Sequence, residues 1–234
     1  LGSKRLLVPH ILRIVEGLGE VRTVIDLFSG TSRVGHALKA AGRRVLANDH
    51  NVYAETLARC YVQADREDVL GDATRLVAEL GALKGEPGYV TRTFCEEARF
   101  FQPKNGARID AIRRAIADKH LDPELEAVLL VALIEAADRV DSTTGVQMAY
   151  LKTWAARAHG DLELRVPEVL SRATCGKGQA FGLDAVEAAA RLEGDLAYLD
   201  PPYNQHSYLG NYHIWETIVR GDAPATYGVA RKRV

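Results

Sequence analysis

Residues 21–32 read VRTVIDLFSGTS, and this stretch decides the fold. The apolar run from Val21 to Phe28 is typical of a buried β-strand, and residues 29–32, SGTS, break it into a tight turn. The apolar residues between 34 and 41 then recur at helical spacing. The stretch therefore predicts a strand, a turn and a helix, which is the repeating unit of an α/β protein.

The residues that follow extend this unit into a parallel sheet. Gly42 closes the predicted helix, and residues 45–47 form a second short apolar strand that ends at Asn48 and Asp49. Two strands joined through a helix are expected to lie parallel. Residues 52–83 carry a helical pattern, with a break expected near Gly71-Asp72, and the loop signal GEPG at 85–88 marks a boundary.

The alternation of strands and helices then stops and later resumes. Helical patterns cover 107–120, 123–141 and 146–158, and they predict a helical insert over residues 88–163. A strand at 180–184, a helix at 185–192 and a strand at 196–199 restore the α/β pattern. We therefore expect an α/β core made of residues 1–87 and 164–234, split by the insert between its second and third strands.

Composition sets only broad limits. The 234 residues are 47% hydrophobic, and 30 basic against 31 acidic side chains give a net charge of −1, which neither supports nor excludes nucleic-acid binding. The three cysteines, Cys60, Cys95 and Cys175, lack the spacing of a zinc site or a disulfide framework. No stretch approaches the ~20 apolar residues of a membrane span, so we expect a soluble, cytoplasmic protein with reduced thiols.

The run Leu199-Asp200-Pro201-Pro202-Tyr203-Asn204 carries the chemistry. Consecutive prolines cannot continue a central strand, so the chain must leave the sheet at Asp200, where open α/β sheets bind their ligands. The Asp200 carboxylate and the Pro201 carbonyl can accept hydrogen bonds from an exocyclic amine, and the Tyr203 ring can stack on a planar base. The motif predicts a site for the amine of a nucleobase, and this chemistry needs no metal.

The first turn and the second strand suit a nucleoside-like cofactor. Gly30 lets the backbone approach a ligand, and free amides at the start of the helix favour an anion, although a plain tight turn fits as well. Asp49 is placed to bind the hydroxyls of a ribose, with a simple helix cap as the alternative. Neither a complete G-x-G-x-x-G nor a P-loop lysine follows the turn, which argues against a polyphosphate.

Four motifs, taken in chain order, resemble the D12 class of adenine-specific DNA methyltransferases. They are Gly2-Ser3-Lys4, residues 26–31 (DLFSGT), Asn48-Asp49 and residues 200–203 (DPPY). The resemblance implies a Rossmann-like core that uses S-adenosylmethionine, an insert that serves as target-recognition region, and duplex DNA as the partner. It also implies that the target base is flipped out of the helix and that the enzyme works with restriction or related defence proteins.

The same resemblance assigns roles to individual residues. Gly2, Ser3 and Lys4 would hold the methionine part of the cofactor, and Asp49 would bind its ribose. Asp26, Phe28 and Gly30 would line the cofactor. The residues that would act on the base are Asp200, Pro201, Pro202 and Tyr203.

An acidic residue after the third strand is expected to read the adenine of the cofactor. Asp72 and Asp184 both compete for this role, and Asp72 is as well suited to capping a helix. One helix and one strand separate Asp184 from Asp200, which is the spacing of adjacent parallel strands. This spacing favours Asp184.

Candidate DNA contacts lie in the insert and after the catalytic motif. The loop at 99–108 mixes cations, amides and aromatic residues, and we select Lys104, Asn105 and Arg108 from it. After the motif, Tyr208 is selected, and His206, Asn211 and Tyr212 are further candidates to cover a flipped base. The competing interpretation is that these charges are only solvated and that the rings pack the interior.

Two departures from the family pattern leave other functions open. Ser32 stands where many methyltransferases have a second glycine, and residues 201–234 are too few for the remaining strands of a full core, so the C-terminal strands are expected to be missing. The alternatives are methylation of RNA or of the cytosine amine, or a fragment that binds cofactor or DNA without turnover. The recognition sequence and the oligomeric state do not follow from the sequence.

Overall fold

The computed structural model describes residues 4–202 and 208–234. The chain forms two compact units, the first made of residues 1–71, 123–128 and 168–203 and the second of residues 72–122, 129–167 and 204–234. Residues 72–87 and 204–234, which the sequence placed with the core, thus belong to the second unit. The assignment of a target-recognition role to the insert stays a prediction.

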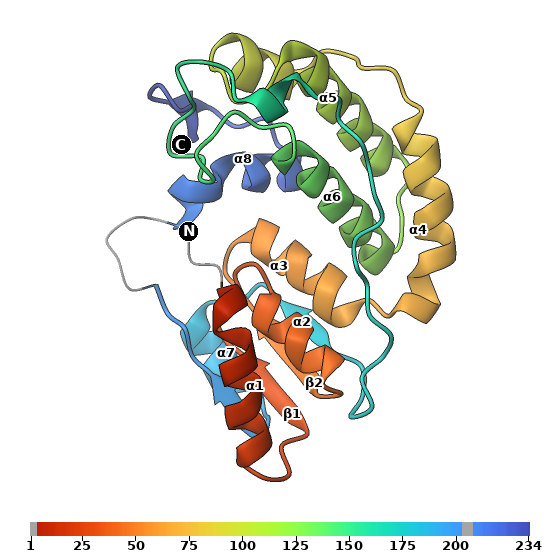
Figure 1. The fold of residues 1–234 in the computed structure, drawn as a ribbon, viewed down its shortest axis with the longest axis vertical. Helices are drawn as coiled ribbons and strands as arrows, with labels where there is room; N and C mark the ends of the chain where they lie inside the picture. The colour runs from red at the N-terminus through yellow and green to blue at the C-terminus, as the bar shows by residue number, and fades with distance from the viewer. Residues whose placement is uncertain (1–3, 203–207) are drawn as a thin grey trace. The chain divides into compact units, whose positions relative to one another are not determined.

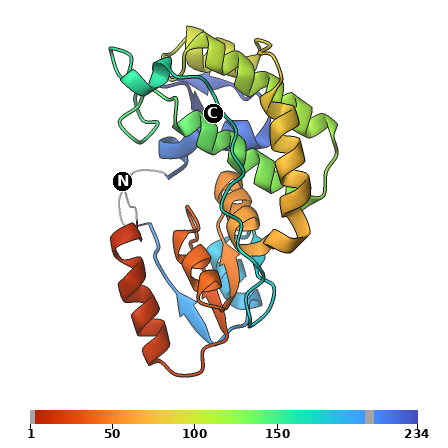
Figure 2. The same cartoon turned by 45° about the vertical axis from the view of Figure 1, so that its right-hand side comes forward.

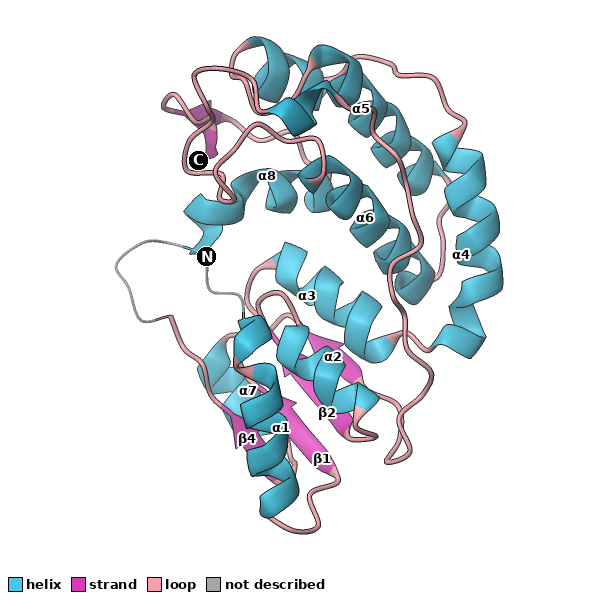
Figure 3. Cartoon of the chain, in the orientation of Figure 1, coloured by secondary structure: helices cyan, strands magenta, loops and turns pink. Residues whose placement is uncertain are grey.

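The first unit contains the expected parallel sheet. Its strands are β1 (Thr23–Asp26), β2 (Arg44–Asn48), β3 (Gln179–Phe181) and β4 (Leu196–Tyr198), in the order β3-β2-β1-β4 (Figures 1 and 3). Val24 of β1 lies opposite both Val45 of β2 and Leu196 of β4, so β1 is a central strand. Figure 2 shows β4 beside β1 although the two strands are far apart in the sequence.

Helices cover both faces of this sheet (Figure 1). Successive strand residues point to opposite faces, so Val24 and Ile25 enter different cores. The Val24 core is closed by α1 (Val8–Gly17) and α2 (Arg33–Ala40), and the short helix η1 (Lys4–Leu6) precedes α1. The Ile25 core is closed by α7 (Ala185–Arg191), which contributes the buried Ala188. The strand, turn and helix expected from residues 21–41 are confirmed.

The helical region after β2 breaks at a different place from the one expected. It consists of α3 (Val52–Ala58), a π-helical turn η2 (Arg59–Gln63) and α4 (Arg66–Gly81). The break predicted at Gly71-Asp72 is wrong, because both residues lie inside α4 on an exposed face, where a glycine costs only about 1 kcal/mol. The chain instead becomes extended at Ala64, next to the buried Asp65.

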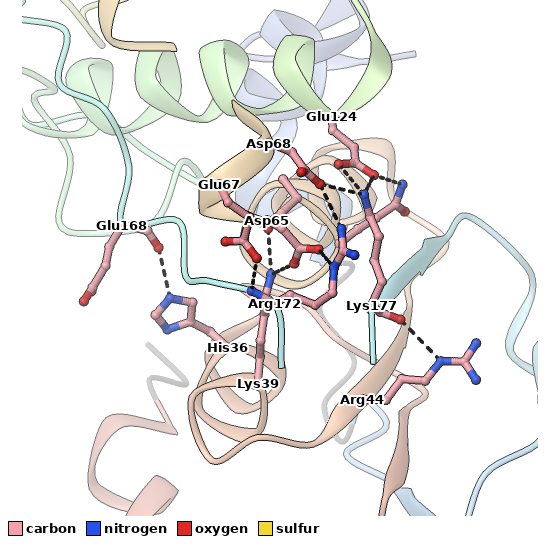
Figure 4. Close-up of polar contacts among 12 residues, drawn as sticks. His36, Lys39, Arg44, Asp65, Glu67, Asp68, Glu124, Glu168, Arg172 and Lys177 are labelled. Carbon is pink, nitrogen blue, oxygen red and sulfur yellow. Dashed lines mark hydrogen bonds and ion pairs between the residues drawn. The ribbon is translucent and has the colours of Figure 1, made fainter. Parts of the chain in front are cut away.

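An ion network centred on the buried Asp65 and Lys39 lies at this break (Figure 4). Lys39 Nζ lies 2.9 Å from Asp65 Oδ1, and Arg172 Nε lies 2.6 Å from Asp65 Oδ2. Nearby, Lys177 pairs with Glu124 at 2.9 Å. Burial acts to raise the pKa of Asp65, but the hydrogen bonds from Arg172 and Lys39 outweigh it and leave this pKa lowered. The network thereby holds the segment that contains Arg172 and Lys177, which leads from the insert back to the sheet, against α2 and the start of α4.

The second unit is mostly helical. Buried aromatic and aliphatic side chains such as Phe94, Phe100 and Leu133 form its core. The helices expected at 107–120 and 123–141 are confirmed, the first beginning earlier than expected. The elements are η3 (a π-helical turn, Thr91–Glu96), α5 (Pro103–Asp118), α6 (Pro123–Asp138, of which residues 123–128 belong to the first unit), η4 (Ala156–His159), α8 (Tyr208–Arg220), β5 (Thr226–Tyr227) and β6 (Lys232–Arg233). Among the described residues, β5 and β6 pair only with each other and do not extend the parallel sheet.

The helix predicted at 146–158 is wrong. Residues 143–150 form a loop closed by an antiparallel bridge between Thr143 and Tyr150, and Gly145 adopts a positive φ of 101°. Arg157 donates to the buried carboxylate of Asp141 and to the Thr143 carbonyl, which draws the following chain back toward the base of the loop. Only the short 3₁₀ turn η4 remains helical. Side-chain capture of this kind overrides a helical pattern in the sequence.

The expected adjacency of the third and fourth strands is also wrong. β3 pairs with β2 and β4 pairs with β1, so β3 and β4 lie at opposite edges of the sheet. The spacing of one helix and one strand between Asp184 and Asp200 therefore spans the whole sheet. The argument from spacing that favoured Asp184 does not hold.

The Asp65 network makes a prediction about stability. We expect Asp65→Ala to lower the free energy of unfolding by about 3–5 kcal/mol, because it leaves the Lys39 ammonium, whose side chain is 2% exposed, without its buried partner. Urea denaturation measures the change. The control is Asp72→Ala, which breaks an exposed pair with Arg75 and should shift the free energy by about 0.5 kcal/mol or less. Equal effects of the two substitutions would contradict the assignment of a buried ion network.

Candidate active site at the carboxyl edge of the sheet

Three carboxylates gather where three parallel strands end. Asp26 is the last residue of β1, Asp49 follows β2, and Asp200 follows β4 shortly after its end. Parallel strands bring their carboxyl ends to one edge, and β1 lies between the other two strands. The sequence expected these residues at strand ends, and the register of the sheet places those three ends together.

Asp26 is the buried member of the three. The residue is 1% exposed, and neither carboxylate oxygen has a hydrogen-bond partner among the described residues. Burial raises its pKa to about 7, with further contributions from the charges of Asp49 and Asp200, while the nearby amide of Gly35 acts in the opposite direction. Near neutral pH this carboxyl therefore exists in both protonation states.

Asp49 ties the second strand to the first turn. Its Oδ2 accepts a hydrogen bond of 2.9 Å from the Gly30 amide, and its Oδ1 accepts from the amide and the side chain of Asn51 at 3.0 Å. Gly30 and Ser32 adopt positive φ angles of 50° and 56°, so the turn is left-handed at both positions. A carboxylate can accept about four hydrogen bonds, which leaves Asp49 capacity for a ligand hydroxyl.

The turn also contains buried polar groups with unmet capacity. The side-chain hydroxyls of Ser29 and Ser32, like the carboxylate of Asp26, are buried and have no partner among the described residues. The start of α2 carries no side-chain cap. Buried polar groups are normally hydrogen-bonded, so this concentration fits a turn that receives a polar, charged ligand. The residues present therefore fit the charged tail of a nucleoside-like cofactor.

Asp200 pairs with the lysine of the N-terminal motif. Lys4 Nζ in η1 lies 2.5 Å from Asp200 Oδ2, and both side chains are partly buried. The sequence comparison gave Lys4 a role in holding the cofactor and did not anticipate this ion pair. Pro201 and Pro202 are exposed. The pKa of the neighbouring Tyr198 is raised, mainly by burial and to a smaller extent by the charge of Asp200.

Several predicted site residues are not described. Gly2, Ser3 and Tyr203 lie outside the described residues, and so does His206. Tyr208 is the first residue of α8, but its side chain is likewise outside the description. Their proposed roles stay predictions.

The two candidates for reading the cofactor adenine occupy different surroundings. Asp184 caps α7, because its Oδ1 accepts a hydrogen bond of 2.8 Å from the Val186 amide, and it follows β3. Asp72 lies inside α4 in the second unit and pairs with Arg75 at 2.9 Å. Asp184 shares the first unit with Asp26 and Asp49. A cofactor contact by Asp184 stays a prediction.

Asn48, the last residue of β2, had no separate role among the sequence-based predictions. It is buried, and its side chain donates to the carbonyls of Leu27 and Leu183 at 3.3 and 3.2 Å and accepts from the Leu183 amide at 3.0 Å. Asn48 thus joins the chain after β1 to the chain after β3. The sequence signal that could have identified this role is a polar residue at the end of a buried apolar run. Phe28, predicted to line the cofactor, packs partly buried against the Ile25 core.

The predicted DNA contacts of the insert make contacts within the second unit. Lys104 is exposed and pairs with Asp161 at 2.6 Å. Asn105 is buried, donates to the Gly160 carbonyl and accepts from the Leu162 amide. Arg108 donates to the Gly81 carbonyl at 2.8 Å. Both ends of the Asn105 amide are thus used within the unit, and the three DNA contacts stay predictions.

A separate cavity lies along β3 at the edge opposite β4. Its volume is about 530 Å³, and its lining includes Arg44, Gln63 and Lys177. Arg44 Nε donates to the Lys177 carbonyl, and Lys177 Nζ donates to Glu124 Oε2. None of the residues predicted from the sequence lines this cavity.

Comparison with known proteins gives a match over nearly the whole chain. Residues 1–233 match the family model of the D12 class N6 adenine-specific DNA methyltransferases. The type II methyltransferase M.NlaIII of Neisseria lactamica is 33% identical over 84% of the chain, and M.FokI of Planomicrobium okeanokoites is 32% identical over 97%. The modification methylase StsI of Streptococcus sanguinis is 29% identical over 99% of the chain.

These relatives are longer than the chain. The matched region covers 60% of M.NlaIII, 38% of M.FokI and 37% of StsI. The chain therefore corresponds to part of each relative.

The buried Asp26 predicts how stability depends on pH. Because its pKa is higher in the folded chain (about 7) than in the unfolded chain (3.8), the stability it contributes is present at low pH and is lost as pH rises through 7. Asp26→Asn should remove this loss. Between pH 5 and pH 8, the free energy of unfolding of the variant should rise relative to that of the wild type by about 2–3 kcal/mol.

Chemical denaturation at the two pH values measures this difference. Glu193→Gln, which removes an exposed carboxylate of the same unit, serves as the control and should leave the pH dependence unchanged. If the stability of the wild type and of Asp26→Asn changed in parallel with pH, the pKa of Asp26 in the folded chain would not be raised, and the prediction would be wrong.

Proposed function

The chain belongs to the D12 class of N6 adenine-specific DNA methyltransferases, and we propose that it transfers a methyl group from S-adenosylmethionine to the exocyclic amine of adenine in duplex DNA. The observation that carries this proposal is the meeting of Asp26, Asp49 and Asp200 at one edge of the sheet. Family membership alone would leave open whether the motifs of this chain are assembled. Their common edge supports an assembled site.

We also propose that the sheet is the core of a Rossmann-like methyltransferase fold. The strand order β3-β2-β1-β4 agrees with the first strands of the doubly wound order. In such sheets the ligand binds beyond the carboxyl ends of the strands. The carboxylates and the Gly30 turn lie at that edge, which supports the proposal.

S-adenosylmethionine fits the first unit through its charged groups and its ribose. Asp26 and the turn around Gly30 would hold the methionine part, and Asp49 would bind the ribose hydroxyls beside its bond to the Gly30 amide. Asp184 would read the adenine of the cofactor. When bound, the cofactor supplies an electrophilic methyl group on a positively charged sulfur. The carboxylates favour such a cation because they create a negative electrostatic potential at this edge of the sheet.

Asp200 and Pro201 would act on the adenine amine. The lone pair of this amine is delocalised into the ring, so it is a weak nucleophile. Hydrogen bonds to the Asp200 carboxylate and the Pro201 carbonyl favour a pyramidal nitrogen and stabilise the positive charge that develops on it. Tyr203 would stack on the ring, and Pro202 would hold the turn of the motif.

Lys4 would orient the catalytic carboxylate. Its ammonium lies 2.5 Å from Asp200 Oδ2, and this ion pair restricts the rotamer of the carboxylate. Because a carboxylate has further acceptor capacity, Asp200 can bind an amine while part of it faces Lys4. This role differs from the contact with the methionine part that the sequence suggested.

The remaining parts of the proposal concern DNA and biological context. The target adenine must be flipped out of the duplex to reach Asp200, and the second unit would supply DNA contacts, with Lys104, Arg108 and Tyr208 as candidates. The relatives are named as type II methyltransferases and a modification methylase, which supports a restriction-modification system with a partner restriction enzyme in the cytoplasm. No helix among the described residues is long and apolar enough to cross a membrane.

Transfer of a labelled methyl group to duplex DNA tests the proposed reaction. The wild type should form N6-methyladenine, identified by mass spectrometry of the digested DNA. Asp200→Asn should lower the single-turnover rate by about 100-fold or more, because the charged acceptor is lost where positive charge develops. Glu187→Gln on the exposed side of α7 is the control. Methylation of cytosine, or an unchanged rate in Asp200→Asn, would refute the assignment.

Cofactor binding tests the first unit separately. Asp49→Ala should weaken the affinity for S-adenosylmethionine about 10- to 100-fold, since hydrogen bonds to a charged group contribute about 1.5–3 kcal/mol. Isothermal titration calorimetry measures this affinity without turnover. Asp72→Ala, which alters an acidic residue of the second unit, should bind the cofactor like the wild type. Weakened binding by Asp72→Ala together with wild-type affinity of Asp49→Ala would instead assign the cofactor contact to Asp72.

A further inference from the structure

An arginine of the second unit lies over the ring of a half-buried tryptophan. The Arg99 guanidinium carbon is 5.0 Å from the centre of the Trp154 ring, and Arg99 Nη1 donates a hydrogen bond of 2.8 Å to the Lys152 carbonyl. The side chains of Arg99 and Lys152 are exposed. Because the face of an indole attracts a cation, the ring and the carbonyl together hold the Arg99 side chain in one orientation at the surface.

The two segments that carry these residues are anchored to the same core. Phe100, which follows Arg99, is fully buried, and its carbonyl accepts a hydrogen bond of 2.8 Å from the Ser142 amide. The Ser142 carbonyl accepts from the Leu151 amide at 2.8 Å, and its hydroxyl accepts from the Ala155 amide at 3.1 Å. Ser142 thus joins the two segments. A group held by a fixed scaffold loses little conformational entropy when it binds a partner.

Arg99 and Lys152 bring two positive charges to one patch. Within the part of the chain that the structure describes, neither side chain forms an ion pair with a carboxylate. The bond to the Lys152 carbonyl uses one of the five N–H donors of the Arg99 guanidinium, so further donors are available. Neighbouring like charges repel each other, and an anion bound between them would remove this repulsion. The patch is therefore suited to an anionic partner.

The cations selected from the sequence differ from this pair. Lys104 is paired with Asp161 at 2.6 Å, and Arg108 donates to the Gly81 carbonyl within the unit. Arg99 belongs to the same loop as both, but Trp154 lies in a segment for which the sequence predicted a helix. The sequence therefore gave no reason to place Arg99 beside Trp154.

Duplex DNA is a partner whose chemistry fits the patch. Its backbone presents closely spaced phosphates, and arginine and lysine side chains are the groups that neutralise them. Contacts of this kind fix the register of a protein on the duplex and do not depend on the base sequence. We propose that Arg99 and Lys152 bind phosphates of the DNA backbone and that Trp154 orients Arg99 for this contact. This inference rests on the proposed function, which makes duplex DNA the partner.

The salt dependence of DNA binding tests the two phosphate contacts. Binding of the full chain to a fluorescently labelled duplex of mixed sequence is measured by anisotropy between about 50 and 200 mM salt. Each phosphate contact releases counterions, so Arg99→Ala should weaken binding and reduce the slope of log K against log salt by about 0.9. Lys152→Ala should reduce the slope by about the same amount. The recognition sequence need not be known, because phosphate contacts also contribute to non-specific binding.

Substitutions of the tryptophan test its orienting role separately from charge. Trp154→Leu leaves both cations in place, so the slope should be unchanged while the affinity for the duplex falls about two- to fivefold. Trp154→Phe retains an aromatic face and should recover part of this loss. Wild-type affinity in Trp154→Leu, or no recovery in Trp154→Phe, would contradict the orienting role.

A matched arginine and the cofactor affinity serve as controls. Arg114 is an exposed arginine of the same unit whose charge is offset by Glu86 at 2.6 Å, so Arg114→Ala should keep the slope of the wild type. Arg99→Ala should bind S-adenosylmethionine like the wild type, because the proposed cofactor residues belong to the first unit. A wild-type slope in Arg99→Ala or Lys152→Ala would overturn the inference, and so would an equal loss of slope in Arg114→Ala. Weaker DNA binding with an unchanged slope would show a structural role and would overturn it as well.

The outcomes also distinguish this inference from the proposed function. If the wild type methylates adenine in duplex DNA but Arg99→Ala keeps the wild-type slope, only the phosphate contacts are refuted. If the wild type binds duplex DNA with the expected loss of slope in the variants but transfers no methyl group, only the proposed reaction is refuted. A wild-type chain that does not bind duplex DNA refutes both.

Discussion

Mutual repulsion among three carboxylates at one edge of a parallel sheet is the constraint on which the site depends. Each carboxylate is accommodated differently. Asp200 is balanced by the Lys4 ammonium, Asp49 by the amides of Gly30 and Asn51, and Asp26 by a raised pKa that lets it hold a proton near neutrality. The edge keeps a negative character in this arrangement. A positively charged methyl donor would relieve the repulsion, so the free site already has the electrostatics that its proposed cofactor needs.

The same constraint explains why the turn after β1 has its form. Asp49 accepts a hydrogen bond from the Gly30 amide in a turn that is left-handed at Gly30 and again at Ser32. Glycine adopts this conformation freely, whereas serine is disfavoured in it. Ser32 therefore accepts strain at the position where many methyltransferases are expected to carry glycine, and its hydroxyl is buried in the same turn. Local backbone strain of this type is common where ligands are bound.

Much of the core was predictable because its signals are local. The apolar run of β1, the turn at Gly30 and the acidic residues after the strands each follow from short stretches of sequence. The features that were missed depend on distant partners. The break at Asp65 requires Lys39 and Arg172. The loop at 143–150 is fixed by the packing of Tyr150 on Phe100 and by a hydrogen bond from the Ile214 amide to Gln147. The edge position of β3 depends on pairing across the sheet, which spacing along the chain does not reveal.

The ion network around Asp65 joins several segments of the chain that are far apart in the sequence but belong to the first unit. Its members lie on α2, at the start of α4, at the start of α6 and on the segment that returns to the sheet, and all of them belong to the first unit. The charges of this network thus all stay within the first unit. Recombination that exchanged the segments between these junctions would keep Asp65, Glu124, Arg172 and Lys177 in place. On the proposed assignment of DNA contacts to the second unit, such an exchange would alter target choice and leave the first unit intact.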